Sequence, residues 1–367
     1  MRKVWTRKGN GSDAPGVKRL IRSPVPERPQ IHQIILPLSW ALDSTQCYLI
    51  EDEPLTLVDT GVRSPASRAA LEGALDQLGY GLSDIERVVL THGHCDHSGG
   101  VETIRDAGAS LECWAHEGDV RLIECYADVI LERADDMKAL FREYGVPEPL
   151  LSRVHAERLE ALEVDRKEGQ ATRVDRVLRE DDRVEWKDFS LRVRHSPGHS
   201  PGHILLEDEE AGLLFTGDTV MGQVMPYTEN FYLSELPDPQ DALRRRPRFR
   251  GLSELRTSLR AIRGRPFKTI LPGYGGLIRR ADRAVRDTLL YYEVRLQRID
   301  RGLRGLAAMG QDVTAFELWK ALFPPDEPFD QMRSHLLLLI GALDCLEEDG
   351  LLVTERRPDG VLVHHHT

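Results

Sequence analysis

The order of apolar and polar positions predicts a β-rich first half that passes into alternating strands and helices. Short apolar runs bounded by turn residues indicate strands, and longer segments with apolar residues three or four apart indicate helices. The strands are predicted at 31–38, 46–50, 55–58, 86–90 and 111–114, with helices at 66–78 and 99–107 between them.

The pattern changes between residues 117 and 180. There, apolar residues such as Ile123, Ile130 and Met137 fall at spacings of one helical face. Residue patterns typical of strands then return, so we expect a helical insertion of about 117–180 within one domain that spans 31–303. The later predictions are strands at 183–193, 204–207, 212–216 and 269–271 and helices at 251–262 and 280–303.

The two ends of the chain differ from this domain. Residues 304–367 are predicted as two helices, 313–323 and 330–346, followed by a hairpin that turns at Asp359-Gly360, an order that is winged-helix-like. Residues 1–30 hold eight Lys or Arg and four Pro with little apolar periodicity, so we expect a flexible N-terminal arm outside the fold.

Composition narrows the class of protein. Hydrophobic residues at 41% and charged residues at 30% are typical of a globular chain. The longest apolar run, 336–340, is far shorter than the ~18 residues of a membrane span, and no secretion signal is visible. The five cysteines are scattered, which argues against a disulfide framework. We therefore expect a cytoplasmic protein without a membrane partner, and the net charge of -11 disfavours a nucleic-acid partner.

The segment 91–97 carries most of the chemical information. It places His92, His94, Asp96 and His97 directly after a predicted strand. Neutral imidazole and carboxylate are the donors that zinc and related divalent metals prefer. Because alternate residues of an extended segment face the same way, His92 and His94 can bind one ion together, whereas Asp96 and His97 face a different direction. This arrangement suits two metal ions held close together.

The sequence resembles the metallo-β-lactamase fold superfamily, whose signature is the HxHxDH pattern found here. The segment 58–61, with Asp59, resembles the family's first motif. The segment 195–203, with His199, resembles the third, and 215–219, with Asp218, resembles the fourth. The resemblance spans residues 31 to about 280.

The resemblance implies an α+β fold, a four-layer αββα sandwich. It also implies two divalent metal ions, with zinc expected, and hydrolysis by a metal-bound hydroxide that Asp96 orients. Asp59 would orient a ligand from behind. Carried over residue by residue, the ligands are His92, His94 and His199 for the first ion and Asp96, His97 and the bridging Asp218 for the second.

Tyr274 departs from the family pattern. The fifth motif usually offers a histidine after Leu-Pro-Gly, but this chain has Tyr274 there. A protonated phenol is a poor zinc ligand, so we expect a weaker or different second site. Three roles are left open for Tyr274: packing or hydrogen bonding without a catalytic duty, direct ligation, and a catalytic duty as acid or oxyanion donor.

Other side chains are expected to have supporting roles. We expect His195 and His203 to act behind the ligands or in the turn, His116 to be structural and Cys95 to pack in the interior. The three histidines 364–366 are interpreted as a tag fragment or a solvated wing.

The substrate class is inferred from the resemblance and from one basic segment. The chain is most similar to glyoxalase II-like hydrolases and to relatives with a C-terminal winged helix, which favours an anionic thioester or ester, such as an acyl-coenzyme A or glutathione thioester. The arginine-rich run 244–250 is either a solvated turn or a handle for its phosphates. A homo-oligomer is left open.

Three alternatives stay open. A metal-dependent endoribonuclease is favoured by the arginine run and the winged-helix-like tail, but residues 311–367 carry eleven Asp or Glu against four Lys or Arg. A mononuclear iron oxygenase acting on a persulfide is suggested by the altered fifth motif. The third alternative is a protein that retains metal but has lost turnover.

Overall fold

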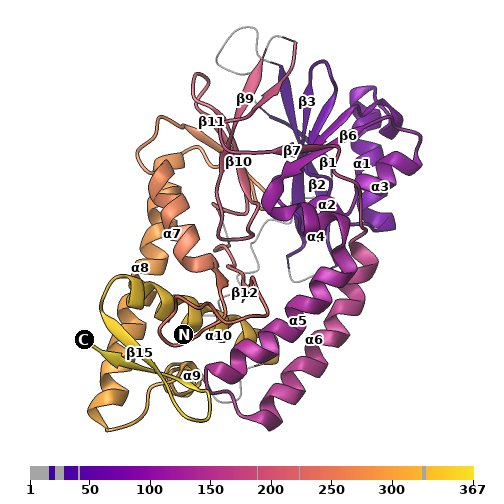
Figure 1. Ribbon diagram of the computed structural model, residues 1–367. Coiled ribbons are helices and arrows are strands. Elements are labelled where there is room, and N and C mark those ends of the chain that lie inside the picture. Colours follow the sequence, from indigo (N-terminus) through magenta and orange to yellow (C-terminus); the bar gives the residue numbers. More distant parts are fainter. Residues whose placement is uncertain (1–15, 21–28, 40–41, 188, 223, 325–327) are drawn as a thin grey trace.

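Two β-sheets lie face to face with helices on the outer side of each (Figure 1). The computed structural model describes residues 16–20, 29–39, 42–187, 189–222, 224–324 and 328–367. Much of the expected N-terminal arm, residues 1–15 and 21–28, lies outside the described residues.

The first sheet has seven strands in sequence order, antiparallel from β1 to β4 and parallel from β4 to β7. Its helices, α1 (Pro65–Leu78) and α3 (Val101–Asp106), come between parallel strands, as crossover connections require. Its strands are β1 (Gly16–Leu20), β2 (Gln30–Pro37), β3 (Ser44–Glu51), β4 (Thr56–Val58), β5 (Arg87–Val89), β6 (Glu112–His116) and β7 (Arg176–Leu178).

The second sheet has the order β14-β11-β10-β9-β8 and is antiparallel except for the β11–β14 pair. The predicted strand 183–193 is two strands joined by a turn, because residues 183–185 pair back onto 190–192. Its strands are β8 (Arg183–Glu185), β9 (Ser190–His195), β10 (Ile204–Asp208), β11 (Leu213–Gly217) and β14 (Thr269–Pro272).

The buried side chains divide the molecule into layers. One cluster, with Leu49 and Leu75, fills the space between the first sheet and α1. A second, with Val58 and Phe215, lies between the two sheets. A third, with Leu214 and Leu255, joins the second sheet to α7 (Gly251–Ile262) and α8 (Ala281–Ala308). Because each strand sends alternate side chains to opposite faces, each sheet supplies two of these clusters.

Local sequence signals explain where α1 begins and ends. The Ser64 hydroxyl accepts a hydrogen bond from the Ser67 amide at 3.1 Å, and Pro65 occupies the first helical position. The helix ends at Gly79, whose φ of 85° is a left-handed conformation that glycine adopts without a Cβ clash.

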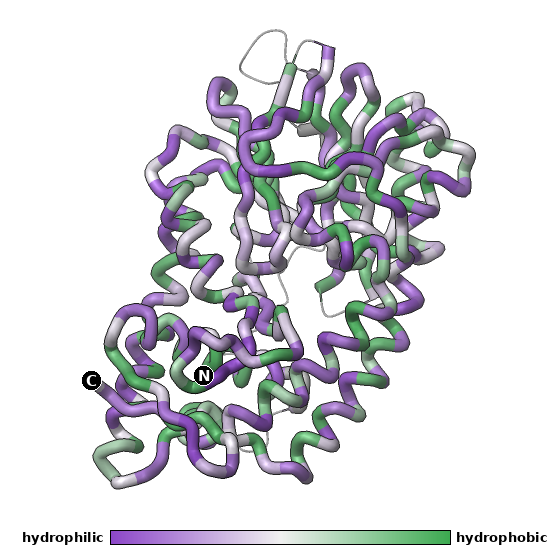
Figure 2. Tube along the Cα trace, viewed as in Figure 1, coloured by the Kyte–Doolittle hydropathy of each residue, from purple (hydrophilic) through white to green (hydrophobic). Residues whose placement is uncertain are grey.

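The helical insertion projects from the sheets as two long antiparallel helices (Figure 1). Hydrophobic and hydrophilic residues alternate along both helices, as expected for one buried face (Figure 2). The two long helices are α5 (Tyr126–Glu143) and α6 (Glu148–Glu168). Three short helices come before them in the chain: α2 (Cys95–Ser98), η2 (Glu117–Asp119) and α4 (Val120–Glu124). The predicted limit of about 180 was too late, because 176–178 already form β7 of the first sheet.

The C-terminal elements follow the predicted order of helix, helix and hairpin: α9 (Ala315–Leu322), α10 (Phe329–Glu348), β15 (Leu352–Arg356) and β16 (Leu362–His366). The predicted domain limit at 303 falls inside α8, and α10 shares one hydrophobic cluster with α7 and α8. A Cβ on Gly341 of α10 would stand 2.9 Å from Leu252 Cβ of α7, so glycine permits this close approach. That these elements form a winged helix stays a prediction.

Two local predictions need correction. Gly16–Leu20, expected outside the fold, pairs antiparallel with β2, because backbone pairing at a sheet edge does not need the apolar periodicity that the segment lacks. The sequence pattern also missed the ribbon of β12 (Asn230–Tyr232) and β13 (Arg248–Arg250). None of the helices among the described residues combines the length and the apolar character that a bilayer span requires.

Candidate metal centre

The HxHxDH segment changes conformation halfway along. It leaves β5 as an extended loop through His94, whose φ and ψ are -69° and 149°, and then turns into the short helix α2. Asp96 and His97 are the second and third residues of that helix, so strand alternation does not continue through the motif. The expected separation of His92 and His94 from His97 is only partial, because the centroids of the His92 and His97 rings lie 4.1 Å apart. Cys95 is buried, as expected.

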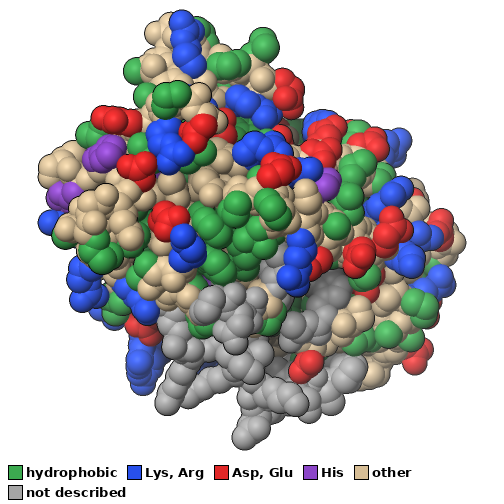
Figure 3. Space-filling model, turned by 90° about the horizontal axis from the view of Figure 1, so that it is seen from below, with side chains coloured by type: hydrophobic (Ala, Val, Ile, Leu, Met, Phe, Trp, Pro, Cys, Tyr) green, Lys and Arg blue, Asp and Glu red, His purple; other side chains and the backbone are tan. Residues whose placement is uncertain are grey.

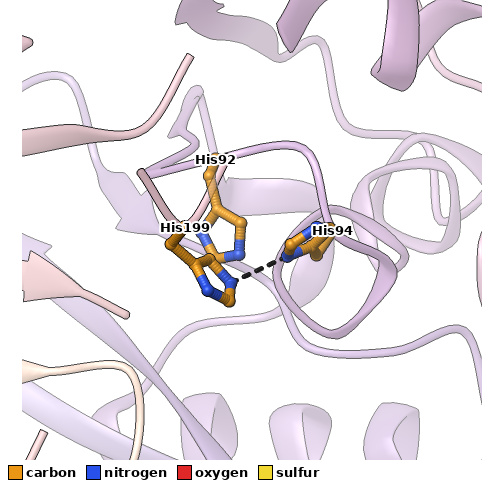
Figure 4. A group of neighbouring side chains, drawn as sticks. All are labelled: His92, His94 and His199. Carbon is orange, nitrogen blue, oxygen red and sulfur yellow. Dashed lines mark hydrogen bonds between the residues drawn. The ribbon is translucent and has the colours of Figure 1, made fainter. Parts of the chain in front are cut away.

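Three histidines form the first group of converging ligands. One ring nitrogen each from His92, His94 and His199 lies within 4.8 Å of the others. The three rings point toward one another, and His94 Nδ1 lies 2.8 Å from His199 Nε2 (Figure 4). A hydrogen bond between His199 Nδ1 and the Tyr227 carbonyl, at 2.8 Å, orients the His199 ring.

A second group forms beside the first and shares His92 with it. Donor atoms of His92, His97 and Asp218 also lie within 4.8 Å of one another. His97 Nε2 is 3.4 Å from Asp218 Oδ1 and 3.5 Å from Asp96 Oδ2. The other carboxylate oxygen of Asp218 is 3.4 Å from His199 Nε2, so Asp218 stands between the two groups.

The donor set fits divalent metal ions. Among the described residues, His92 Nε2, His97 Nε2 and Asp218 Oδ1 are buried without a hydrogen-bond partner, a costly state for polar atoms that metal ligation would relieve. Burial and the neighbouring histidines hold the pKa of His92 well below its usual value, so its imidazole is neutral and offers a lone pair. Metal ligation by the six residues stays a prediction, and the structure brings all six together.

Asp59 orients the second group from behind. Its Oδ2 lies 2.8 Å from His97 Nδ1 and accepts the Thr91 hydroxyl at 2.8 Å, while its Oδ1 accepts the Thr91 amide. The backbone of Asp59 has a positive φ of 62°, which places this carboxylate beneath the ligand loop. With Nδ1 occupied by a carboxylate, His97 presents Nε2 to the site, as expected for this position.

Asp119 is a supporting residue that the sequence argument missed. It is fully buried in η2, and its carboxylate accepts the Gly93 amide at 2.8 Å, the Ser200 hydroxyl at 2.6 Å and the Gly202 amide at 2.8 Å. One side chain thus ties the loop of His92 and His94 to the loop of His199. No local motif marks it, because its three partners come from two distant segments.

Tyr274 faces the second group and is hydrogen-bonded to one of the candidate ligands. Its buried hydroxyl donates a hydrogen bond to Asp96 Oδ2. Burial and the carboxylates of Asp96 and Asp218 raise the pKa of Tyr274 well above its usual value, so the phenol stays protonated. The preceding Gly273 permits this approach, since a Cβ there would stand 2.4 Å from Asp218 Oδ1.

The other histidines have structural partners. His203 Nε2 accepts the Asp218 amide at 3.0 Å, which holds the Asp218 turn, and the ring of His195 stacks on that of His116 at 4.0 Å. His364 contradicts the interpretation of 364–366 as a tag or solvated wing, because it is 2% exposed and stacks on Tyr144.

Apart from the exposed Arg244, the arginine run 244–250 is neither a solvated turn nor a free anion handle. Arg248 is 3% exposed and binds Asp344 of α10 at 2.6 Å. Arg245 binds Asp241 and Glu347, each at 2.8 Å. The run instead fastens β13 to the C-terminal helix, because carboxylates distant in sequence fold against it.

A cavity of about 400 Å3 opens beside the two groups. His94, Asp96, His199, Asp218 and Tyr274 line one end of it. The rest of the lining comes mainly from α4, α5, α6 and α10 and from the segment 224–231. Its apolar side chains include Leu122, Ile130, Met137 and Leu337, and its guanidiniums are those of Arg133, Arg158 and Arg333.

Comparisons with known proteins agree with this architecture. The chain is 26% identical to the probable metallo-hydrolase YqjP of Bacillus subtilis over 298 residues, 79% of this chain and 84% of that protein. It is 29% identical to the acyl-coenzyme A thioesterase MBLAC2 of Bos taurus over 135 residues, only 36% of this chain and 40% of that protein.

The fold is also found among solved structures. A beta-lactamase domain protein from Burkholderia ambifaria superposes with a TM-score of 0.75 at 22% identity, covering 98% of this chain and 97% of that chain. The family model for the metallo-beta-lactamase superfamily matches residues 40–274, which include every candidate ligand and Tyr274. The chain therefore belongs to the metallo-beta-lactamase superfamily.

Proposed function

We propose that the protein is a metal-dependent hydrolase of thioesters that combine an apolar acyl group with an anionic thiol. The observation that carries the proposal is the cavity, whose size is typical of a small-molecule site and which joins the candidate metal ligands to an apolar lining. An acyl group would contact Ile130, Met137 and Leu337, while the guanidiniums of Arg158 and Arg333 suit a phosphate or carboxylate.

The candidate ligands would divide between two ions: His92, His94 and His199 for one, and Asp96, His97 and Asp218 for the other. When bound, divalent ions activate water and polarise a carbonyl oxygen. The chain itself positions the reactants. The Asp96 carboxylate, held by the Tyr274 hydroxyl, orients the attacking water.

A thiol leaving group suits this site. The hydroxyl of Tyr274 is already engaged as a hydrogen-bond donor to Asp96. A thiol has a pKa near ~8.5, so a thiolate departs without a proton donor, whereas an amine leaving from an amide needs one. The partial similarity to an acyl-coenzyme A thioesterase supports the same substrate class.

Support for the endoribonuclease alternative weakens. The arginine run that favoured it is engaged in ion pairs within the chain. On the face shown in Figure 3, the described acidic and basic side chains are interspersed around an apolar area. Such a mixed surface does not favour a polyanion.

The test is a substrate panel with zinc-loaded protein: acyl-coenzyme A with short, medium and long chains, acyl-glutathione, a lactone and single-stranded RNA. We expect the highest kcat/KM for an acyl-coenzyme A, a shift toward shorter chains in Leu337→Trp, and no turnover in His92→Ala/His94→Ala. Faster cleavage of the lactone or RNA would overturn the proposal. So would one iron per chain with oxygen uptake on a persulfide, the signature of an oxygenase.

A further inference from the structure

Glu229 lies behind the first group of ligands, and no sequence motif marks it. It directly precedes β12, its side chain is 12% exposed, and it lines the cavity. Its Oε1 is 3.3 Å from His94 Nε2. The same oxygen accepts a hydrogen bond from Arg133 Nη1 of the insertion helix α5 at 2.5 Å.

The two nitrogens of His94 therefore face different partners. Nδ1 points at His199 Nε2, inside the first group, and Nε2 points outward at Glu229. A neutral imidazole carries one proton. An acceptor at Nε2 holds that proton there and leaves the Nδ1 lone pair for a metal ion.

Arg133 holds the carboxylate in place. Its guanidinium, 18% exposed, pairs with Glu229 and lies 4.2 Å from the centroid of the Phe231 ring. The Glu229 carboxylate is thus anchored from the helical insertion by this ion pair.

We infer that Glu229 is a positioning residue that sets the orientation and tautomer of His94, and that Arg133 connects the helical insertion to the metal site through it. The insertion then does more than line the cavity: it contributes to metal affinity. This inference concerns metal binding by the first group and does not depend on which substrate is hydrolysed.

The test compares Glu229→Ala and Arg133→Met with a matched control, Glu132→Ala. Glu132 neighbours Arg133 on α5 but pairs with Arg121 at the surface. Zinc affinity is measured by chelator competition. We expect about 10- to 100-fold weaker binding in Glu229→Ala, a smaller loss in Arg133→Met, and none in the control. Partial recovery in Glu229→Gln, whose amide oxygen can accept the same hydrogen bond, is expected.

A spectroscopic readout separates positioning from a general structural effect. In zinc-loaded protein with 15N-labelled histidine, His94 should show a slowly exchanging proton on Nε2, assigned by its loss in His94→Gln. That signal should disappear in Glu229→Ala and persist in Glu132→Ala. If Glu229→Ala does not fold, the same readouts in Arg133→Met decide. Zinc affinity within twofold of wild type, or an unchanged Nε2 proton signal, overturns the inference.

Discussion

Replacing Arg248 by methionine should destabilise the protein far more than replacing its neighbours. Arg248 of β13 is 3% exposed, and its Nη2 lies 2.6 Å from Oδ1 of Asp344, which is 1% exposed on α10. The guanidinium also donates to the Tyr144 hydroxyl at 2.9 Å and to Asn230. Methionine fills much of the same space and removes every one of these bonds.

The expected loss of stability comes from the Asp344 carboxylate, which keeps its charge but loses its partner. Breaking a buried ion pair by removing one partner costs about 3–5 kcal/mol, because the other charge is left uncompensated in the interior. Domains are stable by only about 5–15 kcal/mol, so this loss is a large fraction of the total. The double variant Arg248→Met/Asp344→Asn should recover at least about 1 kcal/mol, since the isolated charge is gone.

The assay is urea denaturation of these two variants and of Arg244→Gln. Arg244 is an exposed arginine of the same run, and its replacement should stay within about 0.5 kcal/mol of wild type. A loss below about 1 kcal/mol in Arg248→Met would refute the structural role. A raised KM for an anionic substrate at unchanged stability would instead restore the anion-handle interpretation.

Three further predictions concern the site and the C-terminal hairpin. Asp218→Ala should lower turnover much more than thermal stability; activity within about threefold of wild type, ~0.6 kcal/mol on the barrier, would contradict its place between the two groups. Tyr274→Phe should lower turnover about tenfold at unchanged metal content, because Asp96 loses a hydrogen bond to a charged group, whereas Tyr274→His should raise metal content. If neither change alters turnover or metal content, Tyr274 has no active role and only packs. Burial lowers the pKa of His364 to about 3, so the unfolded chain takes up a proton below pH ~6.5 that the folded chain refuses. Stability should fall by about 1.6 kcal/mol from pH 6.5 to pH 5, and His364→Phe should remove this contribution to the pH dependence of the unfolding free energy.

The sequence by itself determined most of the element order and the candidate ligands. Strand and helix periodicity is a local property, so α1 with its Ser64 cap and Gly79 stop was predictable from a few adjacent residues. Four of the candidate ligands were equally visible, because His92, His94, Asp96 and His97 must be adjacent in sequence for one strand end to present them. The altered fifth motif at Tyr274 was visible for the same reason.

Only the tertiary structure decided what surrounds those ligands. Asp119 and Glu229 act on histidine loops that are far from them in sequence, and nothing in their neighbours along the chain marks them. The arginine run shows the same limit. Its composition suggested solvent or an anion, but Arg248 is buried against Asp344, 96 residues away. Hydrogen bonds and ion pairs form between whatever groups the packed layers bring together, and that proximity is a property of the whole fold.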